Sequence, residues 1–398
     1  MSNLTQDAAG IRIMCVMPSF VVGGMEGAVL RLLAGLAERG AGVHGVTSAW
    51  WGASVRERFE RMSASTSTIC VVPPLRPGSL IPAGLRRMTG HAPVEQRLAE
   101  IAAHCDPTHI LATQVNYAYR ARHLARHRKR ISVFRVPNPP DPSLVGNRQR
   151  FQQLIWRSIH SDYDVIVCNA DYTARLVAQT VGTDRKIRVV RNLAPERPIA
   201  DPKPFPTLPP DRFRIAYIGQ IAPSKGLDEL ILATRPIVKQ DPSVDILIAG
   251  KGHWNDKYEE KLRARIQQDG LENRIYFLGH IEDVKGLLSQ CHVHVCPSIS
   301  PGDSFPNVIL DAKSAGLPSV VFPTAGLPEA VRTGVDGIVC EDQSPVKLES
   351  ALRILLSQPD MTREMGIAAL RSIQDYSAER ILGEWLRLLR PDGWKAWP

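Results

Sequence analysis

A stretch dense in proline divides the sequence into two halves of similar pattern. Residues 194–211 read APERPIADPKPFPTLPPD, and proline there removes backbone N–H groups that a helix interior or a central strand needs. We interpret this stretch as a linker. On both sides of it, short apolar runs alternate with amphipathic stretches, a pattern that predicts parallel sheets covered by helices on both faces. A chain of 398 residues also exceeds the size at which a single core usually divides.

The predicted fold class is therefore α/β, with two Rossmann-like parallel-sheet domains facing a cleft. We place the N-terminal domain at residues 1–195, the linker at 196–212 and the C-terminal domain at 213–377. Because ligands of such sheets bind beyond the carboxyl ends of the strands, functional residues are expected in the loops that follow them. The expected strands are residues 11–18, 42–47, 68–72, 108–113, 131–136, 165–169, 187–190, 213–218, 244–249, 275–278, 293–297, 319–322 and 337–340.

Positive charge is concentrated in the first half of the chain. Residues 1–195 contain 25 Lys and Arg against 13 Asp and Glu, a net charge of +12, whereas the whole chain carries +9. The concentration peaks at residues 120–135 (RARHLARHRKRISVFR) and favours an anionic partner, such as a phosphate-bearing acceptor or an anionic membrane surface. A solvated helix face is the alternative interpretation. Nucleic acid is not expected, because the basic run lacks interleaved aromatic residues.

Seven scattered cysteines, with no C-x-x-C pair, favour reduced and mostly buried thiols over a disulfide framework or a zinc site. The polar N-terminus lacks the pattern of a signal peptide, and no apolar run approaches the roughly 20 residues that span a bilayer. We therefore expect a cytoplasmic protein, with peripheral contact at the inner face of the membrane if its acceptor is a lipid.

Three loops that follow predicted strands carry unusual residues. The first, SFVVGGMEG, contains Gly23 and Gly24 before a helical stretch, where backbone N–H groups can approach an anion. It lacks the G-x-G-x-x-G dinucleotide fingerprint, and a plain tight turn is the alternative. The second, YIGQIAPSKG, places Lys225 near a helix start, where a cation suits a diphosphate whose charge grows as a sugar leaves. The alternative there is a solvated loop lysine.

The third loop, PSISPGDSFPNVILDAKSAG, carries two carboxylates eight residues apart. Asp303 ends a loop and Asp311 lies about one turn into the following helix, so both can face one ligand. The free N–H groups at the helix start offer an anion site beside them. Helix N-terminal charge and a surface aspartate are the alternative, but an unpaired acid within this apolar helix is disfavoured.

The order of these motifs along almost the whole chain resembles glycosyltransferase family 4, retaining enzymes of the two-Rossmann GT-B architecture. GGMEGAVLRLLAGLAERG resembles the GG-x-E opening, and YIGQIAPSKGLDELILA resembles the G-R-x-x-x-x-K-G donor loop. DVIVCNADYTARLV resembles the family's run into the linker, and DSFPNVILDAKSAGLPSVVFPTAGLPEAV resembles the E-x7-E element and the segment after it. In this architecture the last helix crosses back, so residues 378–398 are expected to pack on the N-terminal domain.

The resemblance implies a role for each matched residue. Gly23 and Gly24 would approach the donor diphosphate, Lys225 would bind it, and Asp303 would hold hydroxyls of the donor sugar. Lys225 and Asp303 are the catalytic candidates, and no metal or separate cofactor is implied beyond a UDP- or GDP-sugar donor. The remaining donor-binding candidates are Gly219, Gln220, Lys251, Ile281, Ser304, Phe305, Pro306, Asn307, Val308 and Asp311, the last of which would bind the ribose.

The sequence departs from the family pattern at three donor-site positions. Asp303 and Asp311 stand where the family has glutamates, and Gln220 stands where it has an arginine. A lost transition-state donor costs roughly 10²–10³ in rate, so Lys251 in the neighbouring loop is a candidate substitute cation. On the acceptor side, where the family often has a histidine, Arg135 and Asn138 are the candidates.

These observations predict a retaining transferase that moves a hexosyl-type sugar from a nucleotide diphosphate sugar to an acceptor hydroxyl. A glycan or a lipid-linked intermediate of surface polysaccharide assembly is the expected acceptor, and a small soluble acceptor stays open. One alternative is a catalytically weakened partner subunit of another glycosyltransferase. The other is a nucleotide-sugar epimerase or a phosphorylase on the same architecture.

Overall fold

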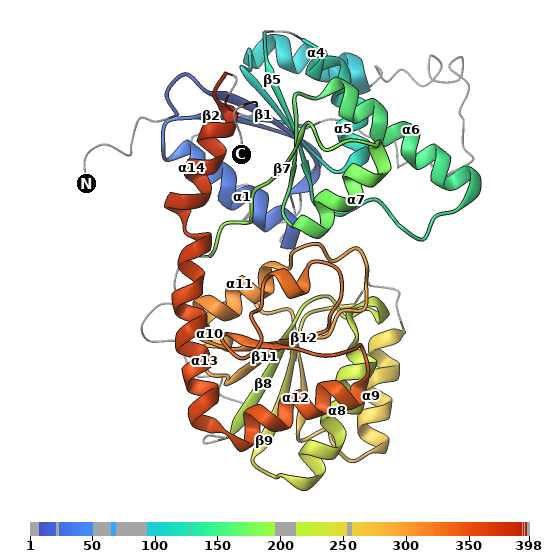
Figure 1. The fold of residues 1–398 in the computed structure, drawn as a ribbon, viewed down its shortest axis with the longest axis vertical. Coiled ribbons are helices and arrows are strands. Elements are labelled where there is room, and N and C mark those ends of the chain that lie inside the picture. The colour runs from blue at the N-terminus through green and yellow to red at the C-terminus, as the bar shows by residue number, and fades with distance from the viewer. Residues whose placement is uncertain are drawn as a thin grey trace. The chain divides into compact units, whose positions relative to one another are not determined.

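The computed structural model describes residues 8–20, 24–50, 65–68, 94–127, 129–195, 212–252 and 257–391, together with 393 and 395 (Figure 1). The chain divides into two compact units. Unit 1 comprises Met1–Leu193 and Ala378–Pro398, and unit 2 comprises Ala194–Ser377. Each unit is an α/β layer structure around one parallel sheet, so the predicted fold class is confirmed.

Unit 1 contains a seven-stranded sheet in the order β3-β2-β1-β4-β5-β6-β7, with every neighbouring pair parallel. Parallel strands need crossover connections, and the helices between them supply these. The elements are β1 (Arg12–Phe20), α1 (Gly24–Ala37), β2 (Gly42–Trp50), β3 (Ser65–Thr68), α4 (Val94–Cys105), β4 (His109–Thr113), α5 (Val115–Ala125), β5 (Ile131–Val136), α6 (Gly146–Asp162), β6 (Val165–Cys168), α7 (Asp171–Val181), β7 (Ile187–Val189) and α14 (Ala378–Leu389).

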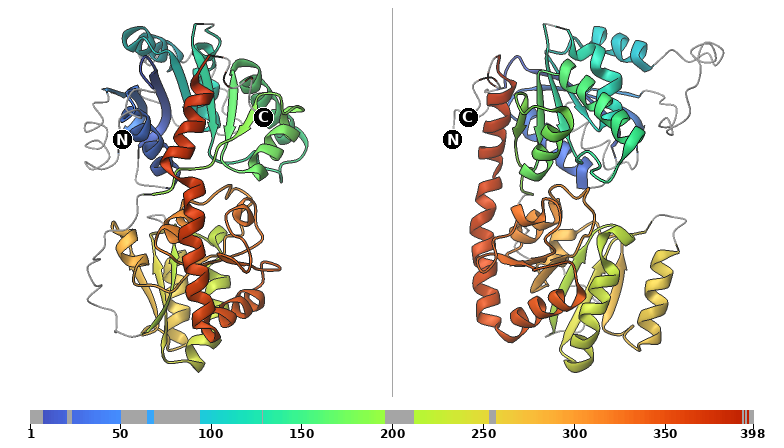
Figure 2. Two further views of the ribbon diagram at one scale, coloured as in Figure 1. Left: turned by 60° about the vertical axis from the view of Figure 1, so that its left-hand side comes forward. Right: turned by 45° about the vertical axis from the view of Figure 1, so that its right-hand side comes forward.

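Two groups of helices bury the faces of this sheet. Helices α1 and α14 lie side by side on one face, as Figures 1 and 2 show, and pack with β1, β4, β5 and β6 into one apolar cluster. Gly35 of α1 makes this approach possible, because a Cβ there would lie 2.5 Å from Cδ1 of Leu382 on α14. Helices α4 to α7 bury the other face. The strands are thus buried on both sides, as their apolar runs predict.

Unit 2 contains a six-stranded parallel sheet in the order β10-β9-β8-β11-β12-β13. Helices α8, α9 and α12 bury one face, and α10 and α11 bury the other. The elements are β8 (Phe213–Ile218), η1 (Pro223–Lys225), α8 (Leu227–Gln240), β9 (Val244–Ala249), α9 (Tyr258–Gln268), β10 (Ile275–Gly279), α10 (Val284–Leu288), β11 (Val293–Cys296), α11 (Asn307–Ser314), β12 (Ser319–Val321), η2 (Leu327–Glu329), β13 (Gly337–Val339), α12 (Pro345–Ser357), α13 (Pro359–Ser372) and η3 (Ile373–Tyr376).

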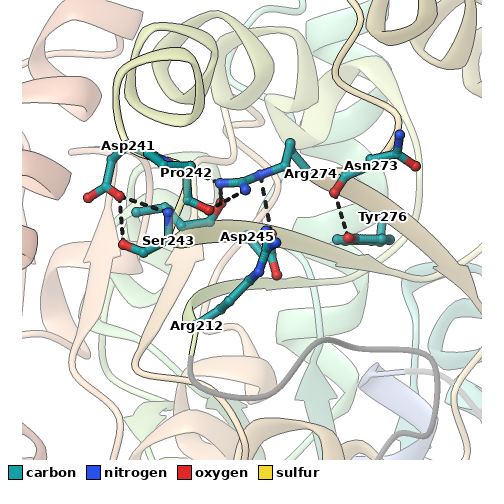
Figure 3. A network of polar contacts seen from close by, with 9 residues as sticks. Arg212, Asp241, Pro242, Ser243, Asp245, Asn273, Arg274 and Tyr276 are labelled. Atoms are coloured by element: carbon teal, nitrogen blue, oxygen red, sulfur yellow. Dashed lines mark hydrogen bonds and ion pairs between the residues drawn. The ribbon is translucent and has the colours of Figure 1, made fainter.

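A buried carboxylate fastens the amino ends of three strands in unit 2 (Figure 3). Asp245 on β9 is fully buried, with Oδ1 3.1 Å from Nη1 of Arg212 and 3.4 Å from Nε of Arg274. Arg274 also donates to the backbone carbonyls of Asp241, Pro242 and Val244. Arg212 precedes β8 and Arg274 precedes β10, so one carboxylate holds the edge of the sheet that is opposite to the carboxyl ends of the strands.

The expected strands agree with the observed ones to within a few residues, except at the edge of unit 1. A strand was expected at residues 68–72, whereas β3 covers Ser65–Thr68 and residues 69–72 lie outside the described part of the chain. The STST sequence of β3 has no apolar run, which is why the pattern missed it. Among the described residues, no helix is long and apolar enough to span a bilayer. The six described cysteines are all free thiols, and five of them are buried.

Candidate active site

The loop that carries Lys225 is locked against the loop after β11. Gly226 has φ 71°, and a Cβ on it would lie 1.8 Å from the carbonyl oxygen of Pro297, so only glycine fits there. The carbonyl of Ser224 accepts hydrogen bonds from the backbone N–H of Ile299 and the hydroxyl of Ser298, both at 3.1 Å. The two loops at the carboxyl ends of β8 and β11 are therefore one rigid surface.

Lys225 and Asp303 form a close ion pair on this surface. The Nζ atom of Lys225 lies 2.6 Å from Oδ1 and 2.7 Å from Oδ2 of Asp303, although 78 residues separate them. Their side chains are 27% and 18% exposed, so both groups are accessible to a ligand. The carbonyl of Asp303 accepts the N–H of Gly326, which ties the loop to a third strand end. The structure thus brings together the two residues that the sequence predicts as catalytic.

Helix α11 begins four residues after Asp303. Ser304, Phe305 and Asn307 are buried, and the Phe305 ring packs against Tyr376 at a centroid distance of 5.7 Å. Pro306 occupies the N-cap without a side-chain cap, so the first N–H groups of the helix, at Asn307 and Val308, are not capped by that residue. Asp311 lies one turn further on and is partly exposed. The start of α11 therefore follows directly on the loop that holds the Lys225–Asp303 pair.

The remaining donor candidates lie on the neighbouring strand ends. Gly219 and Gly250 are in contact, because a Cβ on Gly250 would lie 1.7 Å from the Gly219 carbonyl. Gln220 is exposed, and its carbonyl accepts the phenol of Tyr217 at 2.7 Å. Burial raises the pKa of Tyr217 well above its usual value, with Cys296 and Asp303 adding to the shift, so the phenol stays protonated and fixes this turn.

Lys251 and Ile281 complete the row of donor candidates. The carbonyl of Lys251 accepts the N–H of Ile221 at 3.0 Å, so Lys251 lies beside the loop of Gln220, and its side chain is exposed. Ile281 follows β10 and packs partly into the apolar cluster beneath α10 and α11.

A buried polar network that was not predicted from the sequence lies behind α11. The Nζ atom of Lys313 lies 2.7 Å from Oδ2 of Asp336 and 2.9 Å from Oγ of Ser372. Lys313 is 2% exposed and Asp336 is fully buried. The signal was present, since a lysine in the apolar helix NVILDAKSAG needs a buried partner as much as Asp311 does. This network joins α11 to the β12–β13 connection and to α13.

The predicted site residues of unit 1 differ from one another in burial. Gly24 opens α1, whereas Gly23 lies outside the described residues. Arg135 is buried at the carboxyl end of β5, with Nη2 2.6 Å from Oδ1 of Asn192. Asn138 lies in the following loop and is exposed, so the structure does not bring Arg135 and Asn138 into one buried cluster. Among the described residues, no group of three or more His, Cys, Asp or Glu is arranged to hold a metal ion.

Two family models together match most of the chain. Residues 22–194 match the model described as "Glycosyltransferase Family 4", and residues 201–371 match the model described as "Glycosyl transferases group 1". The fold is similar to that of Anabaena Alr3699/HepE, solved in complex with UDP and glucose, with a TM-score of 0.78, 19% identity and coverage of 95% of this chain and 99% of that one. The two parallel-sheet units thus define a GT-B protein. The chain belongs to glycosyltransferase family 4.

Curated relatives match over part of their length. The chain is 28% identical over 264 residues to the GDP-mannose-dependent monoacylated alpha-(1-6)-phosphatidylinositol monomannoside mannosyltransferase of Corynebacterium glutamicum, which covers 61% of this chain and 65% of the relative. It is 26% identical over 176 residues to an uncharacterized glycosyltransferase of Haemophilus influenzae, which covers 44% and 48%. The chain thus spans less than two thirds of the length of these relatives.

Proposed function

We propose that this protein transfers a hexosyl sugar from a nucleotide diphosphate sugar to an acceptor hydroxyl, with retention of configuration at the anomeric carbon. The observation that carries the proposal is the Lys225–Asp303 pair beside the start of α11. When the donor binds, the ammonium of Lys225 exchanges one carboxylate partner for the diphosphate. Asp303 then accepts hydrogen bonds from sugar hydroxyls, and the N–H groups of Asn307 and Val308 bind phosphate oxygens.

In this proposal, binding and catalysis use the same cation. As the bond between the sugar and the diphosphate breaks, negative charge grows on the leaving phosphate, and Lys225 stabilises it at that moment. Asp311 binds the ribose from one turn into α11. Lys251 supplies the second positive charge, because its backbone lies beside Gln220, at which the family has an arginine. No metal or separate cofactor takes part.

We infer the donor and the acceptor from the named activities and bound ligands of the relatives. The Corynebacterium relative is named as GDP-mannose dependent and acts on a phosphatidylinositol mannoside, and the Anabaena structure holds UDP and glucose. We propose a UDP- or GDP-sugar donor and a lipid-linked or glycolipid acceptor at the cytoplasmic face of a membrane. The net charge of +12 in residues 1–195 supports contact with such an anionic surface.

A panel of UDP, GDP, ADP and their sugars, followed by thermal unfolding, tests the donor. A ligand at 100 times its Kd stabilises the folded state by about 2.7 kcal/mol. Lys225→Ala should abolish most of that shift, whereas Lys261→Ala, at an exposed lysine of α9, should leave it intact. No shift with any nucleotide in the wild type would overturn the proposal.

A second candidate function is that of a partner subunit with weakened catalysis. It is favoured by the aspartates at positions 303 and 311 and by the exposed Gln220. Mass spectrometry of reactions with membrane lipid extracts distinguishes the transferase from the partner subunit. Transfer to a lipid supports the enzyme, and donor binding without transfer or hydrolysis supports the partner subunit.

A further inference from the structure

Arg135 is a buried cation for which the described part of the chain supplies no carboxylate partner. Arg135 is 5% exposed, and Nη2 donates to Asn192, but Nη1 meets no hydrogen-bond partner among the residues that the structure describes. Among the described residues, no Asp or Glu pairs with it. The pKa of Arg135 is lowered to about 10, mainly by burial and in smaller part by Arg31, while Cys15 acts in the opposite direction; the guanidinium stays charged at neutral pH. Cys15, the other titratable group close to it, is a neutral thiol because burial raises its pKa to about 12.

Two further buried polar groups lie on the same face of the sheet. Thr113 on β4 is the register partner of Arg135 on β5, and side chains of paired residues in neighbouring parallel strands share a face. Asn169 directly follows β6, two residues beyond Val167, which is the register partner of Arg135 on the other side. Within the described ranges, the Oγ1 atom of Thr113 and the Oδ1 atom of Asn169 are buried without a hydrogen-bond partner. All three lie at the carboxyl ends of their strands, on the face that α1 covers.

Such a cluster is costly in a structural role. A buried charge needs a counter-charge, and leaving it unpaired costs the full desolvation penalty. A guanidinium fork beside a hydroxyl matches the oxygens of a phosphate, which Arg recognises with two N–H groups. Ligands of parallel sheets also bind at the carboxyl ends of strands, where these residues lie.

We propose that Arg135 and Thr113 form an anion subsite that binds a phosphate group of the acceptor. The subsite rests on the proposed function, because it assigns a phosphate-bearing acceptor to the transfer reaction. The phosphate supplies the negative charge that Arg135 lacks, and it accepts hydrogen bonds from Nη1 and from the hydroxyl of Thr113. Its position would fix the acceptor before the sugar is transferred.

The test measures binding of inorganic phosphate by calorimetry in a Lys225→Ala background, which removes the proposed donor-phosphate cation. Arg135→Met should weaken phosphate binding roughly 10- to 150-fold, as expected for a charge-assisted hydrogen bond. Arg97→Met is the matched control, since Arg97 is an exposed arginine of the same unit whose partner Glu100 is also exposed, and this variant should bind phosphate normally. Absence of phosphate binding in the Lys225→Ala protein, or an unchanged Kd in Arg135→Met, would overturn the subsite.

Thr113→Val keeps the test decisive if Arg135→Met does not fold. The substitution preserves volume and removes a hydroxyl that has no partner among the described residues, so the free protein should lose no stability. Phosphate affinity should fall roughly 2- to 10-fold. A hydroxyl with a merely structural role would give the opposite result, a lower unfolding temperature with unchanged affinity.

Two further arms identify the source of the phosphate and separate the proposals. Glycerol phosphate represents soluble esters, and phosphatidylinositol vesicles represent lipids; Arg135-dependent binding should appear with whichever class the acceptor belongs to, and with neither if the subsite is wrong. Nucleotide binding is measured separately with the wild-type protein. Nucleotide binding without phosphate binding refutes only the subsite, and phosphate binding without nucleotide binding refutes the proposed transferase.

Discussion

Replacing Lys313 with methionine would leave a carboxylate stranded in the core of unit 2. Lys313 and Asp336 are both buried, and 2.7 Å separates Nζ of Lys313 from Oδ2 of Asp336. Burial raises the pKa of Asp336, but the hydrogen bonds from Lys313 and from the backbone of Arg332 outweigh it, and its pKa lies below the usual value. Removing one partner of a buried pair costs about 3–5 kcal/mol. Since Nε of Arg332 stays 3.2 Å from the same oxygen, we expect about 3 kcal/mol.

Urea unfolding at pH 7, followed by circular dichroism, measures this loss. In the double variant Lys313→Met/Asp336→Asn the stranded charge is gone, while an amide oxygen still accepts the N–H of Arg332, so it should be more stable than the single variant. Arg363→Met is the control: its pair with Asp360 is exposed, and its midpoint should equal that of the wild type. A wild-type midpoint for Lys313→Met, or a double variant no more stable than the single one, would refute the reasoning.

The same variant links stability to the site. Helix α11 has only eight residues, too few to hold its shape without tertiary contacts. Lys313 anchors its last turn, and the proposed donor contacts of Asn307 and Asp311 lie on its first two turns. Under conditions in which the Lys313→Met protein remains folded, it should therefore bind nucleotide more weakly than the wild type. The double variant should partly restore this affinity.

Three other substitutions test the structure more briefly. Gly226→Ala should cost about 1–2 kcal/mol from the left-handed backbone alone, plus the clash with the Pro297 carbonyl, and urea unfolding should show this; a neutral effect would contradict the locked loop. Burial lowers the pKa of His294 to about 3, so the folded state excludes a proton that the unfolded chain binds below about pH 6.5. Stability should therefore be level above pH 6.5 and fall as the pH drops towards 3, and His294→Phe should flatten that slope; parallel pH profiles would count against it. Asp245→Asn should lower the free energy of unfolding by about 3 kcal/mol, because it leaves Arg274 and a second arginine without their carboxylate, and an unchanged midpoint would show that the network in Figure 3 is not stabilising.

Local patterns determined most of the architecture. Apolar runs encode the described strands other than β3 by their own composition, and the proline-dense stretch marks where one series stops. For the same reason, the sequence alone placed Lys225, Asp303 and Asp311 in or just after loops at strand ends. Their positions follow from the order of strand, loop and helix, which needs no knowledge of distant contacts.

Only the tertiary structure decided which charges meet and which are buried. The pair of Lys225 with Asp303 joins residues 78 positions apart, and the contact of Arg135 with Asn192 joins residues 57 apart. The sequence places Lys313 in an apolar helix, but its partners Asp336 and Ser372 belong to two other segments that close over it. A charged residue has the same letter whether it faces water or the core, and its environment is set by segments that are remote in the chain. The fold was therefore readable from composition and periodicity, whereas the electrostatics of its sites depended on how distant segments pack.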